Sequence, residues 1–241
     1  MSILRTIALF VYLFGYMIVH YATLRRAERA LAAGDLDTVE QIVKANIPRW
    51  SRGILHVTGA RMTVEGQENI PAGPCVFVGY HRSYYDIPIL LTALDAPHGI
   101  LAKEELEKIP LLNRWMKLLG CVFVKRDDIR ASVKALNDAT AIVESGRSFV
   151  IFPEGTRHTE IGEGKTGAAM LAIRTGVPIL PVYITPERKL FKRTKVYIGE
   201  PYMPFTEKRR ANAEDYERVT EDIMEHIRAI RDTREEREAQ G

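Results

Sequence analysis

The sequence has little cysteine, little net charge and no long apolar run. Two cysteines, Cys75 and Cys121, in 241 residues exclude a disulfide framework and favour a reducing compartment. The net charge is +3, with 34 Lys and Arg against 31 Asp and Glu, so neither sign dominates. A composition of 46% hydrophobic and 27% charged residues excludes a wholly disordered or fibrous chain.

The small excess of positive charge lies in the N-terminal quarter. Residues 1–61 carry eight basic and four acidic side chains, a net of +4, and residues 62–241 carry 26 and 27, a net of −1. A nucleic-acid binder would carry its basic surface on the folded domain, so nucleic acid is disfavoured as a partner. We expect residues 1–61 to be a membrane-associating helical unit and residues 62–241 to be one folded domain.

The apolar run from Ile7 to Val19 has thirteen residues without a charge. As a helix it measures about 20 Å, against a hydrocarbon core of roughly 30 Å. Extended over residues 3–24 it reaches about 33 Å, but it then includes Arg5. The run can therefore lie in the interface or span, and a cleaved signal peptide is a third reading, for which no convincing cleavage site follows. If the run spans, the arginines that follow it place the rest of the chain on the cytoplasmic face; they are Arg25, Arg26 and Arg29.

The next segment, Asp35 to His56, is amphipathic at helical spacing. Two readings stay open for it. It can be a helix packed on the main domain, or an interfacial helix with Trp50 at headgroup level. With the preceding run, it predicts a hydrophobic and amphipathic two-helix unit that binds membrane.

From Met62 onward, short apolar runs alternate with helical patterns, which predicts an α/β fold with a mixed, largely parallel sheet flanked by helices. Pro110 should bend or divide the second of these helices. The expected strands are 62–65, 75–79, 98–102, 121–125, 148–152, 179–184 and 195–199, and the expected helices are 85–95, 104–118, 128–145, 166–175 and 214–237.

Polar residues follow several of the predicted strands, where sites form in α/β proteins. His81 follows the strand run CVFVG, and Asp86 lies one helical turn further on. A carboxylate that fixes the tautomer of an imidazole makes it a general base. Ser83-x-x-Asp86 is also a helix capping box, which needs no catalysis.

Two further blocks place cations at strand ends. The run FVIF leads into Pro153-Glu154-Gly155-Thr156-Arg157, where the guanidinium suits bidentate phosphate binding. Gly120-Cys-Val-Phe-Val-Lys-Arg126 is another strand ending in basic residues, and Lys103 follows the strand near 98–102.

With Val177-Pro-Ile-Leu-Pro-Val182, these blocks occur in one order that resembles the four motifs of the glycerolipid acyltransferases, in particular the 1-acylglycerol-3-phosphate acyltransferases. The resemblance runs from about residue 62 to 205. It implies His81 as the general base, Asp86 as its orienting partner, and a substrate-binding group around the acceptor's phosphate. That group comprises Lys103, Arg126, Glu154, Gly155, Thr156 and Arg157.

The implied reaction moves a fatty acyl group from acyl-CoA or acyl carrier protein to the free hydroxyl of lysophosphatidic acid, giving phosphatidic acid at a membrane, without a cofactor or a metal. The sequence departs from the family pattern at three positions. Tyr80 stands where Asn commonly precedes the histidine, Lys125 stands where an acidic residue often precedes the arginine, and no aromatic residue precedes Lys165. Another lysolipid acceptor, such as a lyso-ornithine lipid, is the alternative.

Three unrelated functions fit the sequence less well. Gly162-Glu-Gly-Lys-Thr-Gly167 mimics part of a nucleotide-binding loop, but Thr159 stands where the pattern needs Gly, and the strand ends too early. A membrane adaptor would leave the ordered blocks unexplained. A serine hydrolase is disfavoured because the sequence has no G-x-S-x-G elbow.

Overall fold

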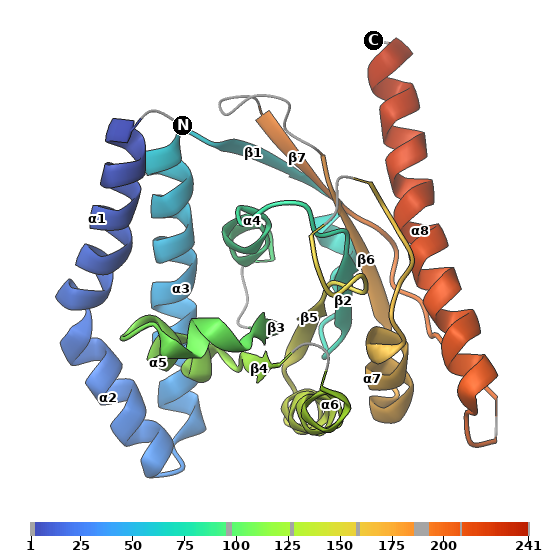
Figure 1. Cartoon of the computed structure of the whole chain (residues 1–241), viewed down its shortest axis with the longest axis horizontal. Helices are drawn as coiled ribbons and strands as arrows, with labels where there is room; N and C mark the ends of the chain where they lie inside the picture. Colours follow the sequence, from blue (N-terminus) through green and yellow to red (C-terminus); the bar gives the residue numbers. More distant parts are fainter. Residues whose placement is uncertain are drawn as a thin grey trace.

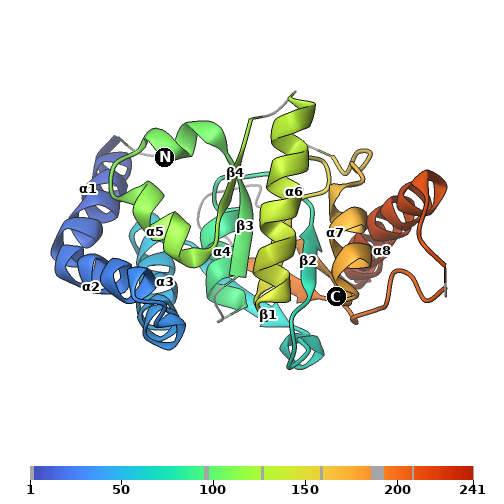
Figure 2. The same cartoon turned by 90° about the horizontal axis from the view of Figure 1, so that it is seen from below.

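The computed structural model describes residues 3–94, 98–125, 128–157, 160–185, 193–207 and 209–240. Within these ranges the chain forms a seven-stranded sheet in the order β1-β7-β6-β2-β5-β3-β4, with helices on both faces (Figures 1 and 2). Neighbouring strands are parallel except β6 and β7, which are antiparallel. This confirms the predicted α/β class. The strands are β1 (Arg61–Glu65), β2 (Val76–Gly79), β3 (His98–Lys103), β4 (Val122–Val124), β5 (Ser148–Ile151), β6 (Ile179–Ile184) and β7 (Arg193–Ile198).

The helices of the main domain lie close to their expected positions, except for the one expected over residues 104–118. That segment is divided into a 3-10 turn, Glu104–Lys108, and a helix, α5, with the break at Pro110. Leu111 takes a positive φ of 65° in the break, which confirms that the proline interrupts the helix. The helices are α4 (Asp86–Ala93), α5 (Leu112–Leu119), α6 (Ile129–Glu144), α7 (Gly167–Thr175) and α8 (Ala213–Gln240).

Alternation along the strands builds two hydrophobic clusters, one on each face of the sheet. In β2, Phe77 enters the cluster shared with α4 and α5, whereas Val76 and Val78 enter the cluster shared with α6, α7 and α8. Figure 2 shows α6 lying along one face, with α4 on the other. The central strand, β2, is thus covered on both faces, which explains its continuous apolar run.

The N-terminal part forms three helices, where the sequence predicted two: α1 (Ile3–Val19), α2 (Tyr21–Ala32) and α3 (Leu36–Thr58). In Figure 1 they stand at the end of the molecule opposite α8. Among the described helices, none by itself has both the length and the apolarity to cross a membrane, although α1 and α2 together pass that test with a 55° bend between them.

The sequence left open whether the apolar side of α3 packs on the main domain or meets a membrane, and the structure shows that it packs on the domain. Val39, Val43 and Ile47 are buried in the cluster that also contains residues of α4, and Trp50 packs against that cluster. The apolar side of α3 is therefore a packing surface. An ion pair also joins α2 to α5, since Arg114 Nη2 lies 2.6 Å from Glu28 Oε2.

Candidate active site

The site lies at the edge of the sheet where the parallel strands end. β2, β3, β4, β5 and β6 all run the same way, so their carboxyl ends share one edge. His81 follows β2 by two residues, Lys103 is the last residue of β3, and Glu154 follows β5 by three. The topology thus brings these three predicted site residues to a common edge.

His81 and Asp86 form a direct pair. His81 Nδ1 lies 2.9 Å from Asp86 Oδ2, with side-chain exposures of 14% and 6%. An ionised carboxylate can only accept hydrogen bonds. His81 Nδ1 therefore carries a hydrogen and donates the hydrogen bond to Asp86. The other ring nitrogen, Nε2, is thereby left unprotonated in the neutral imidazole, which is the state of a general base.

The same carboxylate also fixes the loop between the two residues. Asp86 Oδ2 accepts the backbone N–H groups of Arg82 and Ser83, each at 2.7 Å. A capping box would pair Ser83 Oγ with the N–H of Asp86, but Ser83 Oγ accepts the N–H of Tyr85 at 3.2 Å, and the N-cap residue of α4 is Tyr85, which makes no side-chain cap. One oxygen of Asp86 therefore orients His81 and holds the turn that leads into α4.

Phe152 is a neighbour of His81 that the sequence did not reveal. The two rings stack with centroids 4.2 Å apart and an interplanar angle of 25°. Phe152 belongs to the block that leads to Glu154, so only a fold that aligns β2 with β5 brings it under the imidazole. The hydrogen bond to Asp86 and the stacking on Phe152 together restrict the rotation of the His81 ring.

Tyr80, which precedes His81, is only 5% exposed. Burial raises the pKa of its hydroxyl above the ordinary value of 10. The side chain at this departure from the family pattern is therefore a neutral phenol packed with residues of α6, α7 and α8.

Glu154 is buried, at 3% exposure. Its Oε1 accepts the backbone N–H of Gly162 at 2.8 Å, and its Oε2 lies 3.4 Å from the backbone N of His81. The carboxylate thus ties the loop that follows it to the loop that carries the histidine. This geometry supports a positioning role for Glu154, behind the surface that a substrate would meet. The segment that mimics a nucleotide-binding motif begins at Gly162. Its first N–H group donates to Glu154 and so is not available to a phosphate.

Gly155, Thr156 and Arg157 form the turn after Glu154. Gly155 takes a positive φ of 69°, a conformation that favours glycine. Thr156 and Arg157 are exposed. Arg157 Nη2 donates to the hydroxyl of Tyr84 at 2.9 Å, and its guanidinium carbon lies 3.6 Å from the centroid of the Tyr84 ring.

Two further cations, Lys103 and Arg126, were predicted to bind the substrate. Lys103 Nζ forms an exposed ion pair with Glu105 Oε1 at 2.7 Å, and Arg126 lies outside the described residues. The sequence did not single out Lys165, whose exposed side chain runs past Gly155: a Cβ placed on that glycine would lie 3.5 Å from Lys165 Nζ.

Neither cysteine is suited to nucleophilic chemistry. Burial raises the pKa of the Cys75 thiol to about 11 and that of the Cys121 thiol to about 12, so both remain protonated at neutral pH. Among the described residues, no group of three or more His, Cys, Asp or Glu is placed to hold a metal ion.

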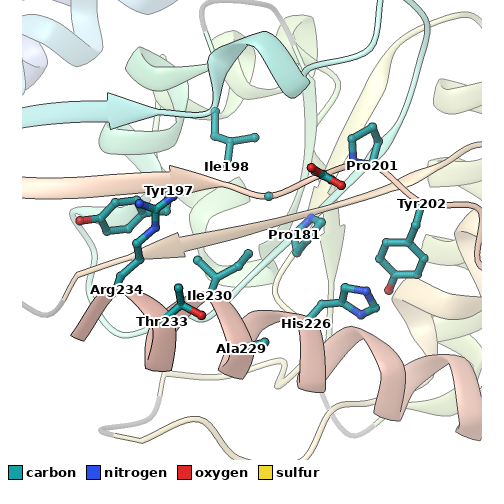
Figure 3. Close-up of a pocket in the computed structure, with 12 residues that line it drawn as sticks. Pro181, Tyr197, Ile198, Pro201, Tyr202, His226, Ala229, Ile230, Thr233 and Arg234 are labelled. Atoms are coloured by element: carbon teal, nitrogen blue, oxygen red, sulfur yellow. The ribbon is translucent and has the colours of Figure 1, made fainter. Parts of the chain in front are cut away.

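A groove of about 380 Å³ lies away from the histidine, between α8 and the segment around the end of β7 (Figure 3). The ring of His226 stacks on Tyr202 there, with centroids 4.2 Å apart. Because β7 runs antiparallel to β6, its carboxyl end lies at the edge of the sheet opposite His81. The groove is therefore separate from the candidate active site.

At the carboxyl edge of this α/β sheet, a buried carboxylate holds a histidine, and an exposed arginine lies on the neighbouring turn. This arrangement is suited to general-base chemistry. A family model described as Acyltransferase matches residues 61–185, which contain every residue of this site. The chain therefore belongs to the acyltransferase family, as the order of its motifs predicted.

Individual relatives of the chain are also acyltransferases. The chain is 36% identical over 131 residues to a chloroplastic 1-acyl-sn-glycerol-3-phosphate acyltransferase of Brassica napus, covering 53% of this chain and 38% of that protein. It is 34% identical over 146 residues to the 1-acyl-sn-glycerol-3-phosphate acyltransferase of Borreliella burgdorferi, covering 59% and 58%. The matched part of the chain thus spans between about two fifths and three fifths of the length of these curated relatives.

The fold is similar along almost its full length to a solved structure, the 1-acyl-sn-glycerophosphate acyltransferase PlsC from Thermotoga maritima. The two share 27% identity and a TM-score of 0.67 over 94% of this chain and 97% of that one. The likeness therefore extends well beyond residues 61–185, the part matched by the family model.

Proposed function

We propose that this protein transfers a fatty acyl group from an acyl thioester, acyl-CoA or acyl carrier protein, to the free hydroxyl of lysophosphatidic acid, giving phosphatidic acid. The observation that carries the proposal is the hydrogen bond of 2.9 Å between His81 Nδ1 and Asp86 Oδ2, which leaves Nε2 as a base. The named relatives, which are 1-acyl-sn-glycerol-3-phosphate acyltransferases, support this choice of acceptor.

The chemistry needs one base and no covalent enzyme intermediate. His81 Nε2 takes the proton of the acceptor hydroxyl while the hydroxyl oxygen attacks the thioester carbonyl carbon. The tetrahedral intermediate then expels the thiolate as its C–S bond breaks, and the thiolate takes the proton from His81. Asp86 stabilises the imidazolium that forms between these steps.

Positioning must supply the larger part of the rate, because general-base catalysis contributes only about 10²–10⁴-fold. Arg157 is exposed on the turn beside the His81 loop, where it can bind the acceptor's phosphate in a bidentate manner. Lys103 and Arg126 are proposed to share this role, since each belongs to a strand that ends at the same edge or immediately follows one.

We further propose that the reaction takes place at a membrane, with residues 1–61 as the attaching unit and residues 62–241 on the cytoplasmic face. The support for membrane attachment is the outer side of α1, which exposes a row of large apolar side chains. Ile3, Leu4, Ile7, Phe10, Val11, Phe14, Ile18 and Val19 are each at least 40% exposed. Such a face is typical of a helix that lies in the interface.

The test is acyl transfer by the purified protein with both donors and a panel of acceptors that includes lysophosphatidic acid and a lyso-ornithine lipid. His81→Ala should lower kcat by about 10²–10⁴-fold. His226→Ala, which removes an exposed histidine from the distant groove, is the matched control and should leave kcat unchanged. Transfer that survives His81→Ala would overturn the mechanism, and a preference for the ornithine acceptor would overturn the proposed substrate.

A further inference from the structure

Tyr84 stands out on the surface of the site. It is 76% exposed, although an aromatic ring of this size is more often buried. It lies inside the motif that runs from His81 to Asp86, at a position to which neither the chemistry above nor the motif pattern gives a role. Its one described partner is Arg157, from a different loop.

The contact with Arg157 has two components. The guanidinium carbon lies 3.6 Å from the ring centroid, which is the geometry of a cation–π interaction. Nη2 donates to the tyrosine hydroxyl at 2.9 Å. A guanidinium has five N–H donors, so four remain for a ligand, and among the described residues no carboxylate forms an ion pair with Arg157.

The backbone around Tyr84 is held by hydrogen bonds close to His81. Asp86 Oδ2 binds His81 Nδ1 together with the backbone N–H groups of Arg82 and Ser83, and the N–H of Tyr85 donates to Ser83 Oγ. The backbone before Tyr84 is therefore held by Asp86, which also orients the histidine, and the N–H that follows Tyr84 is held by Ser83. A group anchored on Tyr84 keeps a defined distance from Nε2.

An exposed arginine without such a support samples many rotamers, and ordering them on binding costs conformational entropy. A ring that already carries the guanidinium removes most of this cost before the ligand arrives. We propose that Tyr84 is a positioning residue that holds the Arg157 guanidinium ready for the phosphate of the acceptor. This inference rests on the proposed function and extends it to acceptor recognition.

The experiment compares Tyr84→Ala, Tyr84→Phe, Arg157→Ala and the double variant Tyr84→Ala/Arg157→Ala in acyl transfer. Lysophosphatidic acid is the acceptor, and monoacylglycerol, which lacks the phosphate, is the control acceptor. Tyr84→Ala should raise KM for lysophosphatidic acid by about five- to tenfold and change kcat by less than about twofold. Tyr84→Phe keeps the ring and should recover most of the affinity.

The double variant distinguishes positioning from direct binding. If Tyr84 acts through Arg157, adding Tyr84→Ala to Arg157→Ala raises KM no further, because the two effects share one contact. Equal effects on both acceptors, an additive double variant, or an unchanged KM in Tyr84→Ala would each overturn the inference. Met203→Ala, an exposed side chain elsewhere, should leave both constants unchanged.

A binding titration separates this inference from the proposed function. Lysophosphatidic acid is titrated into the wild type and into the same variants, without an acyl donor. Weaker binding in Tyr84→Ala than in the wild type supports the inference even if no transfer to this acceptor is observed. Equal binding by both proteins, or no binding by the wild type, overturns it.

Discussion

His98, a buried histidine outside the active site, is expected to make the stability of the fold depend on pH. His98 is fully buried at the start of β3, and neither ring nitrogen has a hydrogen-bond partner among the described residues. Its ring lies 5.4 Å from that of Phe77. Burial lowers the pKa of His98 from 6.5 to about 3, because the charged form cannot be solvated there.

We predict that His98 makes the protein sensitive to acid. Between pH 6.5 and 3 the unfolded chain binds a proton at this residue and the folded chain does not, so the free energy of unfolding falls as the pH falls. From pH 8 to pH 5 the loss is about 2 kcal/mol from this group. His98→Leu should remove that loss and should be at least as stable as the wild type at pH 8, because no unpaired polar nitrogen remains buried.

Denaturant unfolding at pH 8 and pH 5 measures the effect. The difference in stability between the two pH values should be about 2 kcal/mol smaller in His98→Leu than in the wild type. His56→Gln, which changes an exposed histidine in the last turn of α3, should leave the difference as it is. An equal pH dependence in His98→Leu would show that His98 protonates in the folded protein.

At the scale of elements, α8 supports the site although it lies outside the residues matched by the family model. Arg228 Nη2 donates to the carbonyl of Gly162 at 3.1 Å, and the N–H of Gly162 donates to Glu154. A Cβ on Gly164 would lie 2.9 Å from Thr220 and 3.0 Å from Met224. Because α8 fills this space, a side chain at position 164 would have to displace Thr220 or Met224.

We predict that Arg228→Ala lowers kcat by about three- to tenfold with little change in KM, since the loss of a charge-assisted hydrogen bond loosens the loop that Glu154 holds. Steady-state kinetics together with thermal unfolding measure this effect. Glu225→Ala, on the exposed side of α8, is the control and should match the wild type. A lower melting temperature with unchanged kcat would mean that Arg228 stabilises the fold without positioning the site.

Much of this framework could be predicted because its signals are local. All seven strands lie within two residues of their expected bounds, and Pro110 divides the helix in which it stands. The pairing of His81 with Asp86 is also local, because one loop contains both. By contrast, the stacking of Phe152 on His81 and of Arg157 on Tyr84 depends on the alignment of β2 with β5, which no single segment encodes.

The N-terminal helices show a second limit of prediction. Helical periodicity identified the apolar face of α3, but whether such a face meets lipid or protein depends on what packs against it. In the structure α4 and the other N-terminal helices cover it. The short helix α2 has no long apolar stripe and was not expected; it is placed by contacts such as the ion pair between Glu28 and Arg114.

For the whole molecule, the distribution of apolar surface predicts how it attaches to a bilayer. The large apolar side chains that remain exposed among the described residues are concentrated on α1, at the end of the molecule opposite α8 (Figure 1). Ile7 and Val11 are 54% and 67% exposed and lie one helical turn apart. Burying a side chain of this kind contributes about 1.5–3 kcal/mol, so two of them account for a large share of the binding energy of an interfacial helix.

The double variant Ile7→Glu/Val11→Glu should therefore bind vesicles of phosphatidylethanolamine and phosphatidylglycerol at least about tenfold more weakly than the wild type in a sedimentation assay. Its kcat on short-chain substrates below their critical micelle concentration should be unchanged, because both side chains face away from the fold. Val133→Glu, which places one charge on an exposed apolar position of α6, is the control and should bind as the wild type does. Undiminished vesicle binding by the double variant would show that another surface attaches the protein, and a loss of kcat on monomeric substrate would show that α1 supports the catalytic domain itself.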